Sequence, residues 1–212
     1  MRHFTPIDKM VMLLDQSLRA VHSPHQGTAR PNPASRFEEA ELSDSERKHV
    51  VGLMRVNHAG EIAAQALYNG QALTARDEEV RERMQESAVE ETDHLAWCKT
   101  RVNELGGHTS LLGPFWYWGS FAIGAAAGLA GDKWSLGFVK ETEDQVGAHL
   151  EGHLKSLPEK DQKSRAIVEQ MAVDEAHHGD KAVDLGGVPL PAPIKGLMQL
   201  TSRVMTTLSY RV

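Results

Sequence analysis

Four glutamates of this 212-residue chain occupy helix positions that would ordinarily carry apolar side chains. At about 100° of rotation per residue, each shares a face with hydrophobic neighbours. Glu91 lies with Val80, Met84, Ala88, Leu95, Cys98 and Val102; Glu175 with Val168, Met171, Ala172 and Ala182; Glu61 with Met54, Ala64 and Tyr68; Glu143 with Val146, Leu150 and Leu157. Because burying an isolated carboxylate is costly, each glutamate must be protonated, paired with a cation or bound to metal.

Two of these glutamates begin the same short motif, Glu91-Thr-Asp-His94 and Glu175-Ala-His-His178. Residues three apart share one helix face, so the carboxylate and the imidazole can reach one ion or an adjacent pair. Glu61 and Glu143 precede these motifs by 91 − 61 = 30 and 175 − 143 = 32 residues. This internal two-fold repeat predicts six metal ligands around one centre, as in ferritin-like di-iron and di-manganese bundles.

A third motif of this form, Glu46-Arg-Lys-His49, is interpreted as structural because Glu46 completes a capping box and no second half repeats it. His149 lies four residues before His153, but no third ligand accompanies a zinc pair there. We therefore prefer for His149 a role beside a metal ligand or the substrate.

Residues next to the motifs have plainer interpretations. Asp93 and Asp174 are candidates either to hold the ligating imidazoles by hydrogen bonds or to face solvent. His177 lies off the Glu175 face and is expected to be exposed, and Cys98 is expected to be a packed small residue.

The pattern of helix signals predicts an all-α fold. Helices are expected at about 43–75, 78–105, 132–157 and 158–185, with an amphipathic helix from Pro193 onward, and no run of alternating residues indicates a strand. Residues 7–21 also have amphipathic spacing, and a proline-rich stretch at 22–37 follows them. We therefore divide the chain into an N-terminal helix and linker, 1–42, and a bundle domain, 43–212.

Composition narrows the class of partner and the compartment. A formal net charge of -6 and a pI near 6.0 argue against a nucleic-acid partner, because such binding rests on clustered Lys and Arg. Cys98 is the single cysteine, so an internal disulfide is excluded and a reducing compartment is favoured. Residues 1–15 do not form a secretory signal, which favours the cytoplasm.

Residues 106–131 contain no Asp, Glu, Lys or Arg. The stretch from Leu111 to Gly131 approaches the length of a membrane span, but its five glycines and Pro114 make it only mildly hydrophobic. Gly124-x-x-x-Gly128 would allow another helix to approach closely. The segment is expected to be either a core helix or a helix whose Trp116, Tyr117 and Trp118 touch a membrane surface.

The ligand set favours iron, because four carboxylates and two imidazoles suit iron or manganese better than zinc. Paired iron ions can deliver two electrons to O2 together. The residues alone are compatible with hydroxylation, desaturation or oxidation of iron itself.

Four stretches carry a family resemblance. Arg55-Val-Asn-His-Ala-Gly-Glu61, Glu90-Glu-Thr-Asp-His-Leu-Ala-Trp-Cys98, the segment from Gly119 to Phe138 and Asp174-Glu-Ala-His-His-Gly179 closely resemble the Coq7 family of demethoxyubiquinone hydroxylases. The resemblance implies a ferritin-like di-iron monooxygenase that uses O2 to hydroxylate the ring of a late ubiquinone precursor. It implies that the iron ligands are Glu61, Glu91, His94, Glu143, Glu175 and His178, with Glu91 and Glu175 bridging.

The resemblance also implies partners and a location. The partners would be a polyprenylated benzoquinone, a membrane surface, an external electron donor, and a homo-oligomer or a complex of ubiquinone biosynthesis. The protein would lie peripherally on the cytoplasmic face of the cell inner membrane, with residues 113–131 and the C-terminal helix forming the entrance to the site. Asn57 departs from the aspartate common in relatives, and Asn57, Tyr68 and His149 are candidates for contact with a ligand or the substrate.

Three alternatives remain open. A ferritin-like iron-handling protein would only oxidise iron and assemble into a cage. A different di-iron oxygenase, such as a desaturase or a tRNA hydroxylase, would share the ligands. A helical adaptor or lipid-binding module would hold the glutamates in buried ion pairs and would bind no iron.

Overall fold

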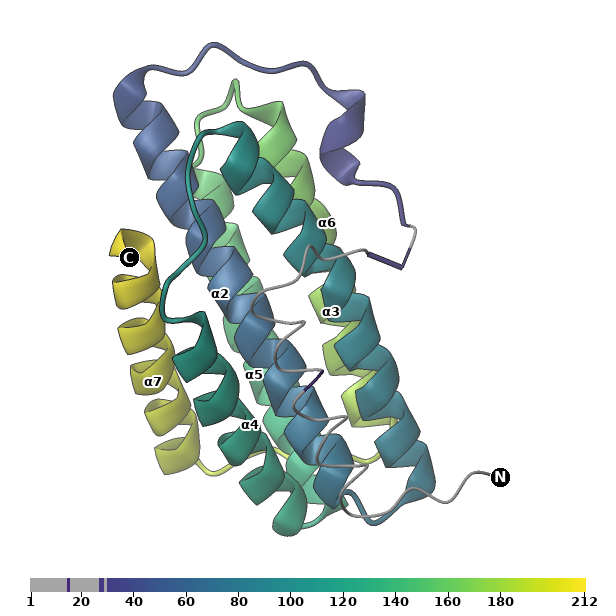
Figure 1. The fold of residues 1–212 in the computed structure, drawn as a ribbon. Coiled ribbons are helices and arrows are strands. Elements are labelled where there is room, and N and C mark those ends of the chain that lie inside the picture. The colour runs from purple at the N-terminus through teal and green to yellow at the C-terminus, as the bar shows by residue number, and fades with distance from the viewer. Residues whose placement is uncertain (1–14, 16–26, 29) are drawn as a thin grey trace.

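Within residues 15, 27–28 and 30–212, which the computed structural model describes, the chain forms helices and no strand (Figure 1). The elements are a short 3-10 helix η1, Pro33–Arg36, and the α-helices α2, Asp44–Thr74; α3, Glu78–Glu104; α4, Gly113–Leu129; α5, Asp132–Ser156; α6, Gln162–Asp184; and α7, Ala192–Arg211. The all-α prediction is confirmed. The helix predicted at residues 7–21 lies outside the described residues, and the division at residue 42 stays a prediction.

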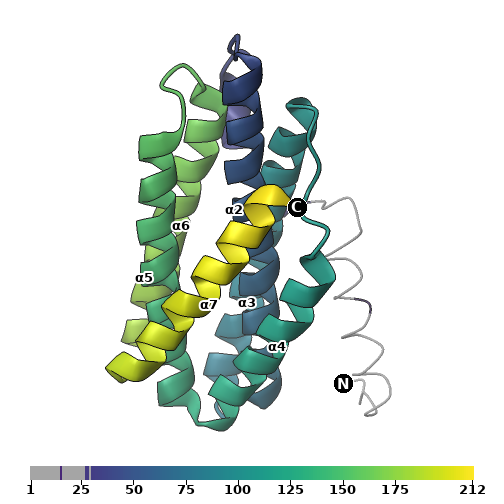
Figure 2. The same cartoon turned by 90° about the vertical axis from the view of Figure 1, so that its left-hand side faces the viewer.

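The helices α2, α3, α5 and α6 form a ferritin-like four-helix bundle, and α4 and α7 lie outside it. Figure 2 shows α7 crossing obliquely in front of the bundle, with α4 running beside α2. The apolar residues predicted to share a face with Glu91 are all buried: Val80, Met84, Ala88, Leu95, Cys98 and Val102. The bundle interior therefore contains the apolar face on which the sequence places Glu91.

Local signals account for most helix ends. Ser43 and Glu46 form the predicted capping box of α2, with the Ser43 amide donating to Glu46 Oε2 at 2.8 Å. The helices α3 and α6 are followed by Gly106 and Gly186, which have φ of 73° and 91°. The helix α5 begins at residue 132 as predicted, and the carboxylate of Asp132 accepts from the amides of residues 76 and 77. The predicted start of α6 was wrong, because α6 begins after Asp161 and not at Pro158.

The helix α4 packs against α2 through glycines. A Cβ atom at Gly124 would clash with the carbonyl oxygen of Leu67, and one at Gly70 would clash with the backbone of Phe121 and Ala125. The predicted small-residue pattern thus lets the two backbones approach closely.

The other side of α4 is open to solvent. Phe115 and Leu129 are 68% and 66% exposed. Among the described helices, none combines the length and the apolar character that crossing a membrane requires.

Candidate metal centre

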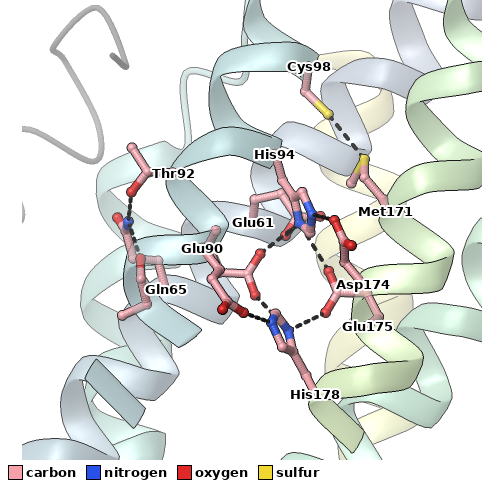
Figure 3. Close-up of polar contacts among 12 residues, drawn as sticks. Glu61, Gln65, Glu90, Thr92, His94, Cys98, Met171, Asp174, Glu175 and His178 are labelled. Carbon is pink, nitrogen blue, oxygen red and sulfur yellow. Dashed lines mark hydrogen bonds and ion pairs between the residues drawn. The ribbon is translucent and has the colours of Figure 1, made fainter. Parts of the chain in front are cut away.

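The six predicted ligands converge inside the bundle from four helices, as Figure 3 shows for most of them. Glu61 comes from α2, Glu91 and His94 from α3, Glu143 from α5, and Glu175 and His178 from α6. All six are at most 4% exposed. Two groups have ligand atoms within 4.8 Å of one another: Glu61 with Glu91, His94 and Glu175, and Glu143 with Glu175 and His178.

Glu91 and Glu175 lie at the middle of this cluster, because each contacts both imidazoles. Nδ1 of His94 lies 2.9 Å from Glu91 Oε2 and 3.2 Å from Glu175 Oε1. Nδ1 of His178 lies 3.1 Å from Glu175 Oε2 and 3.4 Å from Glu91 Oε1. Glu91 and Glu175 are therefore the two carboxylates that both imidazoles share.

Glu61 and Glu143 lie at opposite ends of the cluster. Glu61 Oε2 is 3.6 Å from Nδ1 of His94, whereas Glu143 accepts a hydrogen bond of 2.5 Å from the hydroxyl of Tyr68. Each end thus has one carboxylate and one imidazole beside the shared central pair, which matches the two-fold repeat of the sequence.

The outer nitrogens of the imidazoles donate to acidic residues across the bundle. Nε2 of His94 on α3 donates to Asp174 of α6 at 2.9 Å, and Nε2 of His178 on α6 donates to Glu90 of α3 at 2.6 Å. Both acceptors directly precede the central glutamates in the sequence. An acceptor on the outer nitrogen leaves Nδ1 free to bind metal and orients the ring. Asp174 was a predicted candidate for this role, and Glu90 was missed.

Burial and the neighbouring charges shift the pKa values of the cluster in opposite directions. Burial, together with the charge of Glu91, raises the pKa of Glu61 well above its usual value, and burial and Glu175 do the same for Glu143. Burial acts against the charged imidazoles, but the surrounding carboxylates raise the pKa of His178 to about 12 and that of His94 well above its usual value.

The central glutamates behave differently. Burial alone would raise the pKa of Glu91, but His94 and His178 outweigh it, and the pKa of this carboxyl is lowered. Positive charge at the centre of the cluster therefore stabilises the ionised carboxylates. Two imidazole protons or two divalent cations can supply that charge.

The unpartnered oxygens of the site fit metal ions. Oε2 of Glu143 is buried and has no hydrogen-bond donor, and Oε1 of Glu91 and Oε1 of Glu175 have only the imidazole nitrogens at 3.4 and 3.2 Å, without hydrogen-bond geometry. A buried carboxylate oxygen without a partner is costly, and coordination of a cation removes that cost. Four carboxylates and two imidazoles form an oxygen-rich donor set of the kind that di-iron bundles use.

Of the three residues predicted to contact a ligand or the substrate, Tyr68 contacts the predicted ligand Glu143 in the structure. Asn57 is 3% exposed, and its amide nitrogen lies 3.9 Å from the sulfur of Met54. The ring of His149 lies 3.9 Å from that of His153, centroid to centroid. The roles of Asn57 and His149 stay predictions.

The remaining candidates are placed as follows. Asp93 does not hold an imidazole, because its carboxylate accepts from the amide and the hydroxyl of Thr28, each at 2.6 Å. His177 is exposed, and Cys98 is fully buried with its thiol 3.7 Å from the sulfur of Met171, both as predicted. His49 contacts the Tyr210 hydroxyl at 2.8 Å, which agrees with a structural role for its motif.

Comparison of the whole sequence with known proteins identifies the family of the chain. The family model described as ubiquinone biosynthesis protein COQ7 matches residues 48–209. The chain belongs to the Coq7 family. Its relatives include proteins named 3-demethoxyubiquinol 3-hydroxylase from Laribacter hongkongensis, 57% identical over 97% of this chain and 100% of the relative, and from Polynucleobacter necessarius, 56% identical over 98% and 100%. A third relative of that name, from Stutzerimonas stutzeri, is 54% identical over 100% of this chain and 98% of the relative.

All six cluster residues, with Tyr68, Glu90 and Asp174, lie within the part of the chain that the Coq7 family model covers. The segment before residue 48 lies outside it. The described part of that segment nevertheless contacts the bundle beside the site, as the bonds from Thr28 to Asp93 show.

Proposed function

We propose that this protein is a di-iron monooxygenase that hydroxylates the ring of a demethoxyubiquinol in ubiquinone biosynthesis, with O2 as co-substrate. The observation that carries the proposal is the buried cluster of four glutamates and two histidines, in a chain that matches hydroxylases of that name along nearly its whole length. Each chain would hold two iron ions.

The residues of the site would have distinct roles. Glu91 and Glu175 would bridge the two ions, because each contacts both imidazoles. Glu61 with His94, and Glu143 with His178, would complete the two ends. Iron ions bound there would supply the electrons for O2 activation, and the buried walls of the bundle would exclude water from the reaction. Tyr68 holds Glu143 in place through its hydroxyl.

Beside Glu143 and Tyr68, a crevice between α2 and α5 has no room for a water molecule in this structure. Apolar side chains of α2 and α5 line it, among them Ala64, Leu67 and Val139. We propose that the quinol ring approaches along this side of the bundle, which α4 and α7 flank (Figure 2).

The decisive experiment uses the full chain loaded with iron and reduced without oxygen. A demethoxyubiquinol analogue and ¹⁸O2 are then added, and the product is examined by mass spectrometry. One ¹⁸O atom in the ring is the expected result, and Glu91→Ala should abolish it together with iron binding. Oxidation of iron without any hydroxylated product would favour the iron-handling alternative, and a protein that takes up no iron would favour the adaptor.

We propose further that the protein binds peripherally to the cytoplasmic face of the cell inner membrane through α4 and α7. The large exposed apolar side chains of these two helices include Phe115, Trp118, Ile123, Leu197 and Leu200. Residues 192–212 carry Lys195, Arg203 and Arg211 and no acidic residue. An amphipathic helix of this kind inserts its apolar face at the interface and is attracted to anionic lipids.

Flotation with vesicles that contain anionic lipid tests this surface. Wild-type protein is expected to float with the vesicles, and the double variant Leu197→Ser/Leu200→Ser is expected to bind several-fold less. Val173→Ser is the matched control, because Val173 is 52% exposed but lies on α6. Wild-type protein that stays wholly in the aqueous fraction contradicts the proposal.

A further inference from the structure

The segment before the bundle runs beside the metal centre. The 3-10 helix η1 packs against α6, and Thr28 donates two hydrogen bonds to Asp93 of α3. Further along, Glu39 forms an ion pair with the buried Arg101 of α3 at 2.6 Å. The contacts of this segment thus span α3 and α6, the two helices that carry the Glu-x-x-His motifs.

Arg30 of this segment contacts the partner of a predicted metal ligand. Its guanidinium nitrogen lies 2.7 Å from Oδ2 of Asp174, the same oxygen that accepts from Nε2 of His94 at 2.9 Å. The guanidinium also lies over the ring of Trp97, 5.0 Å from its centroid. Trp97 is 3% exposed, so the guanidinium of Arg30, whose side chain is 36% exposed, lies against a buried ring.

The other half of the repeat lacks such a clamp. The side chain of Glu90, which accepts from His178, is 40% exposed, and Lys181 lies 3.8 Å away with a side chain 39% exposed. A long, solvated pair of this kind contributes little. The Asp174 side chain is 14% exposed and also accepts from Gln170 at 3.0 Å. The acceptors of the two imidazoles therefore differ in how firmly they are held.

We propose that Arg30 is a positioning residue for the metal ion at His94: Trp97 holds the guanidinium, the guanidinium holds Asp174, and Asp174 orients the imidazole. The inference rests on the proposed metal pair. A planar, delocalised cation that stacks on one neighbour and donates to another is well suited to this task. Loss of Arg30 should thus weaken the binding of one of the two metal ions and leave the binding of the other unchanged.

The test is a titration of the full-length metal-free protein with Co²⁺ under anaerobic conditions, followed by visible absorption and by competition with a chelator. Wild-type protein is expected to bind two ions. Arg30→Ala should weaken one binding step roughly tenfold, the lower end of the range for loss of a partner of a metal-bound histidine, and alter the absorption of that ion. Glu90→Gln should weaken the other binding step. The two variants together then assign one step to the His94 end of the cluster and the other to the His178 end.

A double-mutant cycle tests the route through Asp174. If Arg30 acts through that carboxylate, Arg30→Ala/Asp174→Asn should bind Co²⁺ no more weakly than Asp174→Asn alone. Arg30→Lys keeps the charge but loses the stacking plane, so its affinity should fall between those of the wild type and Arg30→Ala. The matched control is Arg36→Ala, which removes an arginine stacked on Phe37 at the same 5.0 Å in the same segment.

Each outcome separates the two hypotheses. Wild-type protein that binds no Co²⁺ contradicts the metal pair itself. If Arg30→Ala binds two Co²⁺ ions as tightly as wild type does and gives the same spectrum, only the role of Arg30 is contradicted. Equal weakening of both steps, with a lower Tm of the metal-free variant, would show a general structural role and overturn the inference.

Discussion

Oδ2 of Asp174 lies 2.9 Å from Nε2 of His94, although the two residues belong to opposite halves of the internal repeat. The reciprocal contact joins Glu90 to His178 at 2.6 Å. Each Glu-x-x-His motif therefore depends on the other helix for the acceptor of its imidazole. The central glutamates Glu91 and Glu175 connect the two halves inside the cluster, and the contacts of Asp174 and Glu90 connect them again outside it.

Glu90→Gln is expected to lower metal affinity at His178 by roughly tenfold, because an amide accepts a weaker hydrogen bond than a carboxylate. The measurement is iron retained per chain after dialysis against a graded series of chelator concentrations. Glu86→Gln is the control, since Glu86 lies one turn away on α3 and pairs with Arg83. Equal retention in Glu90→Gln and Glu86→Gln would contradict the prediction.

Tyr68→Phe should reduce turnover of a demethoxyubiquinol analogue about tenfold at full iron loading. Its hydroxyl donates to Glu143 at 2.5 Å, and a bound iron ion would keep that carboxylate ionised; hydrogen bonds to charged groups are worth about 1.5–3 kcal/mol. Tyr117→Phe should stay within about twofold of wild type, because Tyr117 contacts Asn69 at 3.4 Å and no predicted ligand. Unchanged turnover in iron-loaded Tyr68→Phe would remove Tyr68 from the site.

His153 should make the protein sensitive to mild acid. Burial, followed by His149 and His49, lowers the pKa of His153 from its ordinary 6.5 to about 3. Between these values the unfolded chain binds a proton that the folded protein does not, so stability falls as the pH falls from about 6.5 toward 3. From pH 6.5 to 5.0 the loss is roughly 2 kcal/mol.

The check is the change in Tm between pH 7.5 and 5.0. His153→Gln, which does not titrate there, should lose less Tm than wild type. His177→Gln, a change at an exposed histidine, should behave like wild type. A decrease in Tm as large in His153→Gln as in wild type would count against this assignment.

Two glycine substitutions should have opposite effects on the free energy of unfolding. Gly124→Ala forces α4 away from α2 and is expected to cost about 1–3 kcal/mol. Gly147→Ala, in α5 with no atom within 4 Å of the added Cβ apart from the adjoining backbone of its own helix, is expected to stabilise by about 0.5–1 kcal/mol. Urea denaturation of both variants measures the two effects. A stability of Gly124→Ala equal to or above that of wild type would contradict the close helix contact.

Most of the fold could be predicted from the sequence because its signals are local. The capping box at Ser43 and the glycines at 106 and 186 define helix ends within a turn. The six clustered residues could be found for a related reason, since helical periodicity places each glutamate on an apolar face. At Pro158 the sequence also offered a plausible helix start, but Asp161 caps α6 by accepting from the Ser164 amide.

The contacts around the cluster were harder to predict because tertiary packing decides them. Asp93 and Asp174 are both acidic neighbours of a ligand, yet only Asp174 turns toward an imidazole. Glu90 is partly exposed and does not lie on an apolar helix face, so the pattern that identified the other glutamates did not identify it. Its place directly before Glu91 nevertheless matches that of Asp174 before Glu175. Arg30 lies 144 residues from Asp174 in a turn-forming stretch where no periodicity indicates a contact.

The exchange of acceptors between α3 and α6 means that a helical pair with one half of the repeat is incomplete by itself. Two identical helical pairs facing each other would give each imidazole an acidic acceptor. Because the pairs are identical, both metal ions would then have the same surroundings. Joining the halves in one polypeptide removes that requirement. One metal ion would then lie beside the aspartate that Arg30 contacts and the other beside a partly exposed glutamate, so that two chemically matched sets of predicted ligands would have unequal surroundings.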